Sequence, residues 1–330
     1  MLHVAALGSG SAGNSVLVRS ARSLLLVDCG FTLKETTARM AALGVAPDML
    51  DAVLVTHEHG DHLKGVGPLS RRYGVPVWLT HGTYHGARDR RFAEARLFHA
   101  HEPFVIGDVT VDPFPTPHDA AESCQFVFES GGTRFATVTD LGACTPHVRQ
   151  KLAGVNGLVV ECNYDLEMLR NGPYPAQLQA RIRSDWGHLG NEQAGELLAG
   201  LDHEALSCIL LGHLSERNNS DDAARATVLG HLETRHERVS VLAQHRCSEW
   251  FAVKPGSAAA TDATDADGVA GGAAGGGATR DGVTVGAAGV PCGDAASVVP
   301  RLPGEGTATV TRRRENVPSG RLAGQGARHG

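Results

Sequence analysis

The sequence predicts an α/β domain built in layers, and two patterns in its first 254 residues predict it. Short apolar runs rich in Val and Leu recur between turn-forming residues, as expected of buried strands. Stretches with apolar residues at helical spacing lie between these runs. Two strand-rich halves with helices packed outside them are typical of a layered α/β domain.

The first half contains five expected strands and one expected helix. The stretch 33–45 places Leu33, Thr37, Met40 and Leu43 near one helical face and stops at Gly44, a residue that favours helix ends. The expected strands are HVAAL (3–7), SVLVRS (15–20), SLLLVDCG (23–30), AVLVTH (52–57) and PVWLT (76–80).

The second half repeats this alternation with six expected strands and three expected helices. The strands are DVTVDPF (108–114), CQFVFES (124–130), TRFATVTD (133–140), GLVVEC (157–162), CILLGH (208–213) and RVSVLAQ (238–244). The helices cover 146–154, 191–201 and 221–235.

The composition changes after the folded region. From Gly256 onward the chain has no aromatic residue and is dominated by Gly, Ala, Asp, Thr and Arg, so it cannot bury enough apolar surface to offset the entropy of ordering. We therefore expect one domain over residues 1–254 and a disordered Gly/Ala/Arg-rich tail over residues 255–330. The Arg-rich end of this tail could add weak affinity for nucleic acid or serve no function.

Charge and cysteine usage exclude several classes of protein. The net charge of -6 at pH 7 argues against a cationic polyanion binder, although a local basic patch could still guide nucleic acid. The seven cysteines are odd in number and form no CxxC pair, which disfavours a disulfide framework and a structural zinc site. No signal peptide or long apolar run is visible, so the sequence predicts a cytoplasmic protein without membrane association.

The strongest chemical signal is the segment AVLVTHEHGDHLKG, in which a buried strand runs directly into a cluster of ligand-type residues. His57 and His59 are two residues apart and can point the same way, whereas Asp61 and His62 turn toward a second position. One such motif cannot fill two coordination spheres, so further ligands are expected at strand ends downstream. His118, Asp140 and His213 each stand where an apolar run stops.

The pattern HxHxDH, followed by His, Asp and His in these contexts, resembles the metallo-β-lactamase superfamily over residues 2 to about 253. The resemblance implies a four-layer αβ/βα sandwich with two metal ions at its edge. It also implies the ligands: His57, His59 and His118 for one ion, Asp61, His62 and His213 for the other, and Asp140 as the bridge.

Imidazole and carboxylate ligands suit zinc, manganese or iron. The expected ligands include no thiolate, which would have been the strongest reason to choose zinc. Two divalent ions, zinc or manganese, about 3.5–4 Å apart would turn a bridging water into hydroxide at neutral pH. Asp61 is therefore expected to be catalytic as well as a ligand.

The segments LGSGSAGNS, HEHGDHLKGV, PHDAAE, TDLG, ECNYDLEML, GHLGNEQAG and GHLSERNN resemble the YycJ (WalJ) family of this superfamily. This resemblance implies a 5′-to-3′ DNA exonuclease linked to DNA repair, with DNA as the nucleic acid substrate. The family pattern ESNHD reads ECNYD here, so Tyr164 stands where a histidine is expected and would have to replace it in any catalytic role.

His188 is the expected general acid or phosphate contact. It precedes a helix whose expected N-cap is Asn191, and helix N-termini favour phosphate. His188 also resembles a histidine that helps handle the scissile phosphate in the branch of tRNA 3′-processing endonucleases. The alternative is that His188 has only a structural role in the turn.

Four further residues are expected to contact substrate near the metals: Asn14, in the glycine-rich turn after the first strand, and Asn163, Arg217 and Asn218. Arg217 could equally be a solvated loop charge, and the turn could be a plain connection. A cluster of arginines could contact backbone phosphates, although a solvated helical face is the stronger reading. They are Arg71, Arg72, Arg88, Arg90, Arg91 and Arg96.

Three rival functions remain open at this point. The same metals could hydrolyse a small thioester, lactone or cyclic phosphodiester, or the chain could be an RNA-processing nuclease. A metal-binding regulator without catalysis is disfavoured, because every expected ligand is present. His85 and His101 could line a substrate groove, but surface exposure is the simpler reading.

Overall fold

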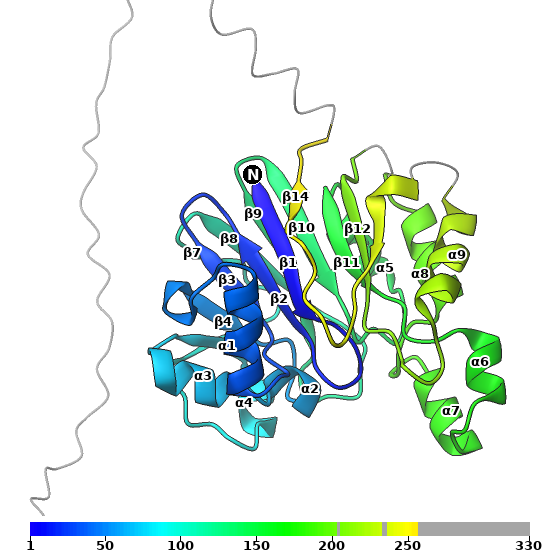
Figure 1. The fold of residues 1–330 in the computed structure, drawn as a ribbon, viewed down its shortest axis with the longest axis horizontal. Helices are drawn as coiled ribbons and strands as arrows, with labels where there is room; N and C mark the ends of the chain where they lie inside the picture. Colours follow the sequence, from blue (N-terminus) through cyan, green and yellow to red (C-terminus); the bar gives the residue numbers. More distant parts are fainter. Residues whose placement is uncertain (203–204, 233–235, 257–330) are drawn as a thin grey trace, which may run out of the picture. The chain divides into compact units, whose positions relative to one another are not determined.

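The computed structural model describes residues 1–202, 205–232 and 236–256, all within one compact unit of the chain. Its first sheet has seven strands in the order β14-β1-β2-β3-β4-β5-β6 (Figure 1). Strands β3 to β6 run parallel, and β14 closes the other edge by pairing antiparallel with β1. The bounds are β1 Leu2–Gly8, β2 Ser15–Arg19, β3 Leu24–Val27, β4 Ala52–Leu54, β5 Val77–Thr80, β6 Ala95–Phe98 and β14 Phe251–Val253.

The second sheet also has seven strands, in the order β13-β12-β11-β10-β9-β8-β7. Strands β10 to β13 are parallel, whereas β9 and β10 form a hairpin whose turn residues Gly131 and Gly132 have φ values of 57° and 73°. The bounds are β7 Phe104–Ile106, β8 Val109–Pro115, β9 Cys124–Ser130, β10 Thr133–Val138, β11 Gly157–Glu161, β12 Cys208–Gly212 and β13 Val239–Val241.

Three buried apolar clusters hold four layers together. The central cluster joins the two sheets through side chains such as Val4, Leu25, Phe126, Phe128 and Leu210. Each large apolar side chain buried there contributes roughly 1.5–3 kcal/mol. The other two clusters attach helices to the outer face of each sheet. The predicted four-layer αβ/βα sandwich is therefore confirmed.

Helices cover the outer faces and the site edge. Helix α1 starts with a capping box, in which the Thr32 and Glu35 side chains accept from each other's backbone N–H. The bounds are α1 Leu33–Ala42, α2 Gly60–Leu63, α3 Val66–Tyr73, α4 His81–Gly86, α5 Pro146–Leu152, α6 Leu166–Asn171, α7 Ala176–Ile182, α8 Asn191–Ala199 and α9 Asp221–His231, with 3-10 turns η1 Pro47–Met49 and η2 His236–Arg238.

Most expected elements are present, but their ends differ. The strand expected over 23–30 stops at Val27, and the helix expected over 221–235 stops at His231, with residues 233–235 outside the described part. Asn191 was expected to cap a helix and does not: it is the first residue of α8, Gly190 holds the N-cap position, and the Asn191 side chain bonds to Asn219. The predicted tail beyond Gly256 also lies outside the described residues.

Candidate metal centre

The candidate site lies where the carboxyl ends of the parallel strands of both sheets meet. In the first sheet, the loop after β4 carries His57 and His59, and the short helix α2 follows with Asp61 and His62. The ring centroid of His57 lies 4.6 Å from that of His59 and 4.2 Å from that of His62. The local motif therefore folds into one compact group of side chains, as expected from its spacing.

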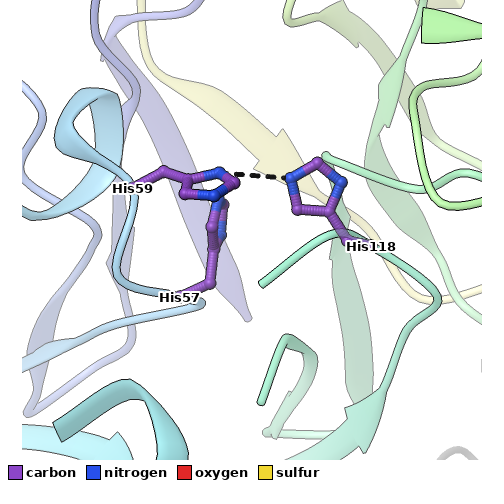
Figure 2. A group of neighbouring side chains, drawn as sticks. All are labelled: His57, His59 and His118. Atoms are coloured by element: carbon purple, nitrogen blue, oxygen red, sulfur yellow. Dashed lines mark hydrogen bonds between the residues drawn. The ribbon is translucent and has the colours of Figure 1, made fainter. Parts of the chain in front are cut away.

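The second sheet brings the three distant residues to the same place. His118 Nε2 lies 3.3 Å from His59 Nδ1, and the three imidazoles of His57, His59 and His118 converge in Figure 2. Asp140 Oδ2 lies 3.0 Å from His62 Nε2, and His213 Nε2 lies 3.5 Å from Asp61 Oδ2. All seven residues expected to bind metal thus form one cluster across the two sheets.

The hydrogen bonds around His57 fix which of its nitrogens faces the cluster. Thr56 Oγ1 donates to Asp28 Oδ2 over 2.8 Å, so the same hydroxyl can only accept from His57 Nδ1, 3.0 Å away. His57 Nε2 is then unprotonated. It is buried and has no hydrogen-bond partner, and a buried polar atom without a partner is costly. A metal ion would supply the missing partner.

Three other histidines are oriented in the same way, through Nδ1. His62 Nδ1 lies 2.8 Å from Asp28 Oδ2, His118 Nδ1 lies 3.0 Å from the Gly187 carbonyl, and His213 Nδ1 lies 2.8 Å from Glu161 Oε1. In each case Nδ1 keeps its proton and donates it in a hydrogen bond to the oxygen, so the lone pair of Nε2 faces the cluster. This is the arrangement that carboxylates and carbonyls impose on metal-binding histidines.

The electrostatics of the cluster call for positive charge. Burial lowers the pKa of His57 well below its usual value. Burial opposes protonation of His62 and His213 too, but nearby carboxylates, led by Asp140, raise the pKa of His62 well above its usual range and that of His213 to about 10. Burial likewise disfavours ionised Asp140, yet the charges of His213 and His62 hold its pKa well below the ordinary value. Without metal, protons on these imidazoles balance the carboxylates, and bound cations would displace them.

The side chains fit divalent ions. Four overlapping sets of three or four of them present ligand atoms within 4.8 Å of one another, including the sets His57–His59–His118 and Asp61–His62–His213. Besides His57 Nε2, the buried Asp140 Oδ2 has no hydrogen bond of acceptable geometry, although His62 is close. Imidazole and carboxylate donors of this kind bind divalent metals.

Sequence reasoning missed two buried carboxylates that organise the cluster. Asp28 accepts from Thr56 N and Thr56 Oγ1 as well as contacting His62, and Glu161 contacts both His188 and His213 over 2.8 Å. Each stands at the end of an apolar strand, in LLLVD and GLVVE. That position was the available signal, the same one that pointed to Asp140.

Backbone strain marks the same place. Among the described residues, the non-glycine residues with positive φ are Asp28 at 58°, Asp140 at 54° and His213 at 56°. Left-handed conformations are uncommon for residues other than glycine and concentrate at functional sites. Each of the three follows a strand and turns its side chain into the cluster.

His188 lies beside the cluster and belongs to its hydrogen-bond network. Its ring centroid is 5.3 Å from that of His118 and 5.2 Å from that of His213. Its Nδ1 is held by Glu161, whereas Nε2 makes no hydrogen bond with the described residues, and the side chain is 23% exposed. Burial alone would lower the pKa of His188, but the charge of Glu161 outweighs it and raises that pKa.

The two asparagines expected near the metals are buried against histidines. Asn14 accepts from Ser9 Oγ and Gly10 N, and its Nδ2 lies 3.2 Å from His62 Nε2. Asn163 Nδ2 donates to the His213 carbonyl over 3.0 Å. Both therefore support the cluster, and their contact with substrate stays a prediction.

The remaining expected contacts lie farther out. Arg217 is exposed and makes no ion pair with the described residues, whereas Asn218 is buried against Ser215. Their substrate roles also stay predictions. The Tyr164 hydroxyl donates to Gln193 on α8, so Tyr164 is directed at that helix and does not take the place of a histidine in the cluster.

Three of the six arginines in the expected cluster pair with acidic neighbours. Asp89 pairs with both Arg71 and Arg91, and Arg96 pairs with Glu94. Other histidines contact rings outside the metal cluster: His81 stacks on His99, His85 contacts Tyr84, and His101 lies near His147. The six described cysteines are free, as expected: Cys29, Cys124, Cys144, Cys162, Cys208 and Cys247.

Comparisons with known proteins agree with this geometry. A family model described as the beta-lactamase superfamily domain matches residues 24–209. Exodeoxyribonuclease YycJ of Bacillus anthracis is 36% identical over 242 residues, which are 71% of this chain and 90% of that protein. Exodeoxyribonuclease WalJ of Streptococcus pneumoniae serotype 2 is 34% identical over 236 residues, 68% of this chain and 86% of that protein.

Among solved structures, the metallo-beta-lactamase fold protein YhfI of Bacillus subtilis aligns with a TM-score of 0.59 at 19% identity, over 75% of this chain and 98% of that one. Fold and cluster together define a metal-dependent hydrolase of the beta-lactamase superfamily. Within it, the chain belongs to the family of the exodeoxyribonucleases YycJ and WalJ. No helix in the described part of the chain is long and apolar enough to cross a membrane.

Proposed function

We propose that this protein is a dinuclear metal-dependent phosphodiesterase that acts as a 5′-to-3′ exonuclease on DNA. The observation that carries the proposal is the cluster of seven ligand-type side chains, in which the buried His57 Nε2 has no hydrogen-bond partner, in a chain whose family members are named exodeoxyribonucleases. The direction of cleavage and the link to DNA repair rest on the family resemblance.

We assign His57, His59 and His118 to one ion, Asp61, His62 and His213 to the other, and Asp140 to both. The sets with ligand atoms within 4.8 Å support this division. Zinc and manganese both suit these donors. Two such ions, when bound, lower the pKa of water and neutralise charge on the attacking and leaving oxygens.

We assign the proton that the leaving sugar oxygen needs to His188. Glu161 holds its Nδ1, so the partly exposed Nε2 is the nitrogen that can face a substrate beside the cluster. General acid catalysis by a positioned side chain typically raises the rate by roughly 10²- to 10⁴-fold. Glu161 is then a positioning residue that sets His188 and His213 together.

We place the activity in the cytoplasm. The six free cysteines of the described part support a reducing compartment, because secreted proteins of this kind usually pair them.

Purified protein tests the proposal with labelled single-stranded and duplex DNA, RNA and bis(p-nitrophenyl) phosphate, each with zinc or manganese. We expect stepwise release of mononucleotides from DNA 5′ ends. His59→Ala or Asp61→Ala should abolish cleavage with the fold preserved, whereas His81→Ala, outside the cluster, should not. Degradation that survives removal of metal by a chelator would sink the proposal, and turnover of small esters with no attack on DNA would favour the small-molecule alternative.

A further inference from the structure

A helical arm leaves the sandwich beside the metal cluster. Between β11 and α8 the chain forms α6 and α7, which extend away from both sheets (Figure 1). Helix α7 contributes no residue to the buried core. Its side chains are therefore available for something other than holding the fold together.

A cavity of about 230 Å³ lies between this arm and the cluster, and we call it the arm pocket. Its lining includes Ser11, Asn163, Tyr174, Leu178, Ile182 and His188. Pockets for drug-sized ligands usually measure roughly 300–1,000 Å³, so the arm pocket has room for about one nucleoside and not for a length of strand.

The lining has two chemically different walls. Leu178 and Ile182 lie four residues apart, on one face of α7, and form an apolar wall with Tyr174. Ser11 and Asn163 give the other side polar groups. A nucleoside has the same two-sided character, because its base has flat apolar faces while its sugar and base edges form hydrogen bonds.

The arginine of this pocket is already neutralised. Arg181 Nε donates to Asp119 Oδ2 over 2.7 Å, and its Nη2 contacts the same oxygen. Both residues line the arm pocket, so the pair adds little net charge there. The pocket therefore suits the uncharged nucleoside part of a nucleotide better than its phosphate.

An exposed tryptophan lies next to the pocket lining in the chain. Trp186 immediately precedes Gly187 of the pocket lining, and its carbonyl accepts from the N–H of Asp119. Its side chain is 61% exposed, and no other aromatic side chain is among the large apolar residues exposed in the described part. Aromatic side chains in this setting stack on unpaired bases, whatever the base.

The position of His188 tells which nucleotide the arm pocket would receive. In exonucleolysis from the 5′ end, water forms a new bond to phosphorus, the P–O3′ bond of the terminal nucleotide breaks, and O3′ takes a proton. If His188 supplies that proton, the terminal nucleotide lies on the His188 side of the scissile phosphate. The arm pocket is on that side, since His188 is part of its lining.

We propose that the arm pocket, together with the neighbouring Trp186, binds the nucleoside of the 5′-terminal unpaired nucleotide of a DNA strand, so that cleavage removes one nucleotide at a time. This inference rests on the proposed exonuclease function and adds the subsite that makes it exonucleolytic. The metal cluster performs the hydrolysis, and the arm selects a strand end.

Filling the pocket is the first test. Leu178→Trp places a large side chain in the cavity, whereas Met168→Trp makes the same kind of change on α6, outside the lining. We expect Leu178→Trp to lower kcat/KM on a 5′-phosphorylated oligonucleotide by roughly 10²-fold, as misplacement at a reacting centre does. Hydrolysis of bis(p-nitrophenyl) phosphate, which needs only the metals, should match wild type, and Met168→Trp should match it on both substrates.

The second test changes the substrate as well as the protein. Trp186→Ala should raise KM for the oligonucleotide roughly 5- to 150-fold, the range for the loss of one base–aromatic stack. Trp186→Phe should largely restore it, and Val105→Ala, an equally exposed apolar site on β7, should leave it unchanged. An abasic 5′-terminal nucleotide should weaken wild type by the same factor and Trp186→Ala hardly at all, because the two changes remove one contact.

The outcomes separate this inference from the function beneath it. Leu178→Trp that degrades DNA as wild type does, or Trp186→Ala that still distinguishes a base from an abasic end, overturns the subsite and leaves the exonuclease intact. A wild-type protein that cleaves bis(p-nitrophenyl) phosphate but never releases nucleotides from DNA overturns the proposed function itself, and the subsite with it.

Discussion

Replacing Glu161 by Gln should cost metal affinity although Glu161 is not in the proposed ligand set. The carboxylate is fully buried and faces four donors. Oε2 accepts from the backbone N–H of Leu141 over 2.9 Å and of Leu189 over 3.1 Å, and Oε1 lies 2.8 Å from Nδ1 of both His188 and His213. An amide has the same shape but offers only one oxygen.

The backbone donors decide how the glutamine sits. An N–H of the main chain cannot become an acceptor, so the amide oxygen must stay with Leu141 and Leu189, and the NH₂ group turns toward the imidazoles. His188 and His213 then have to accept at Nδ1 and carry their proton on Nε2. A protonated Nε2 has no lone pair for a metal, so His213 loses its capacity to bind unless the network rearranges at a cost.

Changes in such supporting carboxylates typically lower metal affinity about 10- to 100-fold. At a fixed excess of metal this corresponds to about 1.4–2.7 kcal/mol less stabilisation. For a domain of this size the loss appears as a melting temperature roughly 3–11 °C lower in the presence of metal. Competition of zinc with a chromogenic chelator, together with thermal melts with and without metal, measures both quantities.

Glu192→Gln is the matched control, because that carboxylate is exposed and pairs with His231 away from the cluster. Its metal affinity should equal that of wild type. If Glu161→Gln also binds zinc with wild-type affinity, the assignment of tautomers by Glu161 is refuted, together with the orientation of His213 derived from it.

Three other expectations follow from the structure. Asparagine at position 28 tolerates a left-handed backbone, but Asp28→Asn puts an NH₂ group among the donors of Thr56 and His62. Metal affinity, measured by chelator competition, should therefore fall about 10- to 100-fold. An unchanged affinity would contradict the role of Asp28. We propose that the domain ends after β14, so a chain that stops at Lys254 should melt within about 2 °C of the full chain and keep its activity; a larger drop would move the boundary. Burial raises the pKa of Cys29 to about 12 and that of Cys162 and Cys124 well above the usual range. Because the thiolate is the reactive form, a disulfide reagent should label the buried thiols only after denaturation. Fast labelling of the native protein, read by mass spectrometry, would contradict this. The buried thiols are Cys29, Cys124, Cys162 and Cys208.

The seven clustered residues were predictable because four share one motif that follows an apolar strand, and the other three are ligand-type residues that stand where an apolar run stops. The layers were predictable for a related reason, since strand pattern and helix spacing both leave local traces. Asp28 and Glu161 satisfy the same positional rule, but a single carboxylate after a strand is ambiguous until its partner is known, and their partners lie 34 and 52 residues away at His62 and His213.

Elements held by distant contacts were missed. Strand β14 has three residues and exists because Val253 and Phe251 pair with Leu2 and Val4 across the length of the domain. The expected cap at Asn191 was wrong by one residue, since the helix already begins at Asn191, whose side chain bonds to an asparagine 28 residues later. The arm helices α6 and α7 have only six and seven residues and bury almost no side chain in the core, so each is too short for a repeated apolar spacing to show in the sequence.

The left-handed backbone at Asp28, Asp140 and His213 sets heat resistance against activity at three positions. Glycine would adopt those φ values without strain, so each substitution would relax the main chain while removing a side chain from the cluster. A variant library screened for thermal survival alone would be drawn to such changes and would return folded, inactive protein. Laboratory evolution of this protein therefore needs selection for turnover in every round, and the codons of these three residues should be sequenced for glycine substitutions.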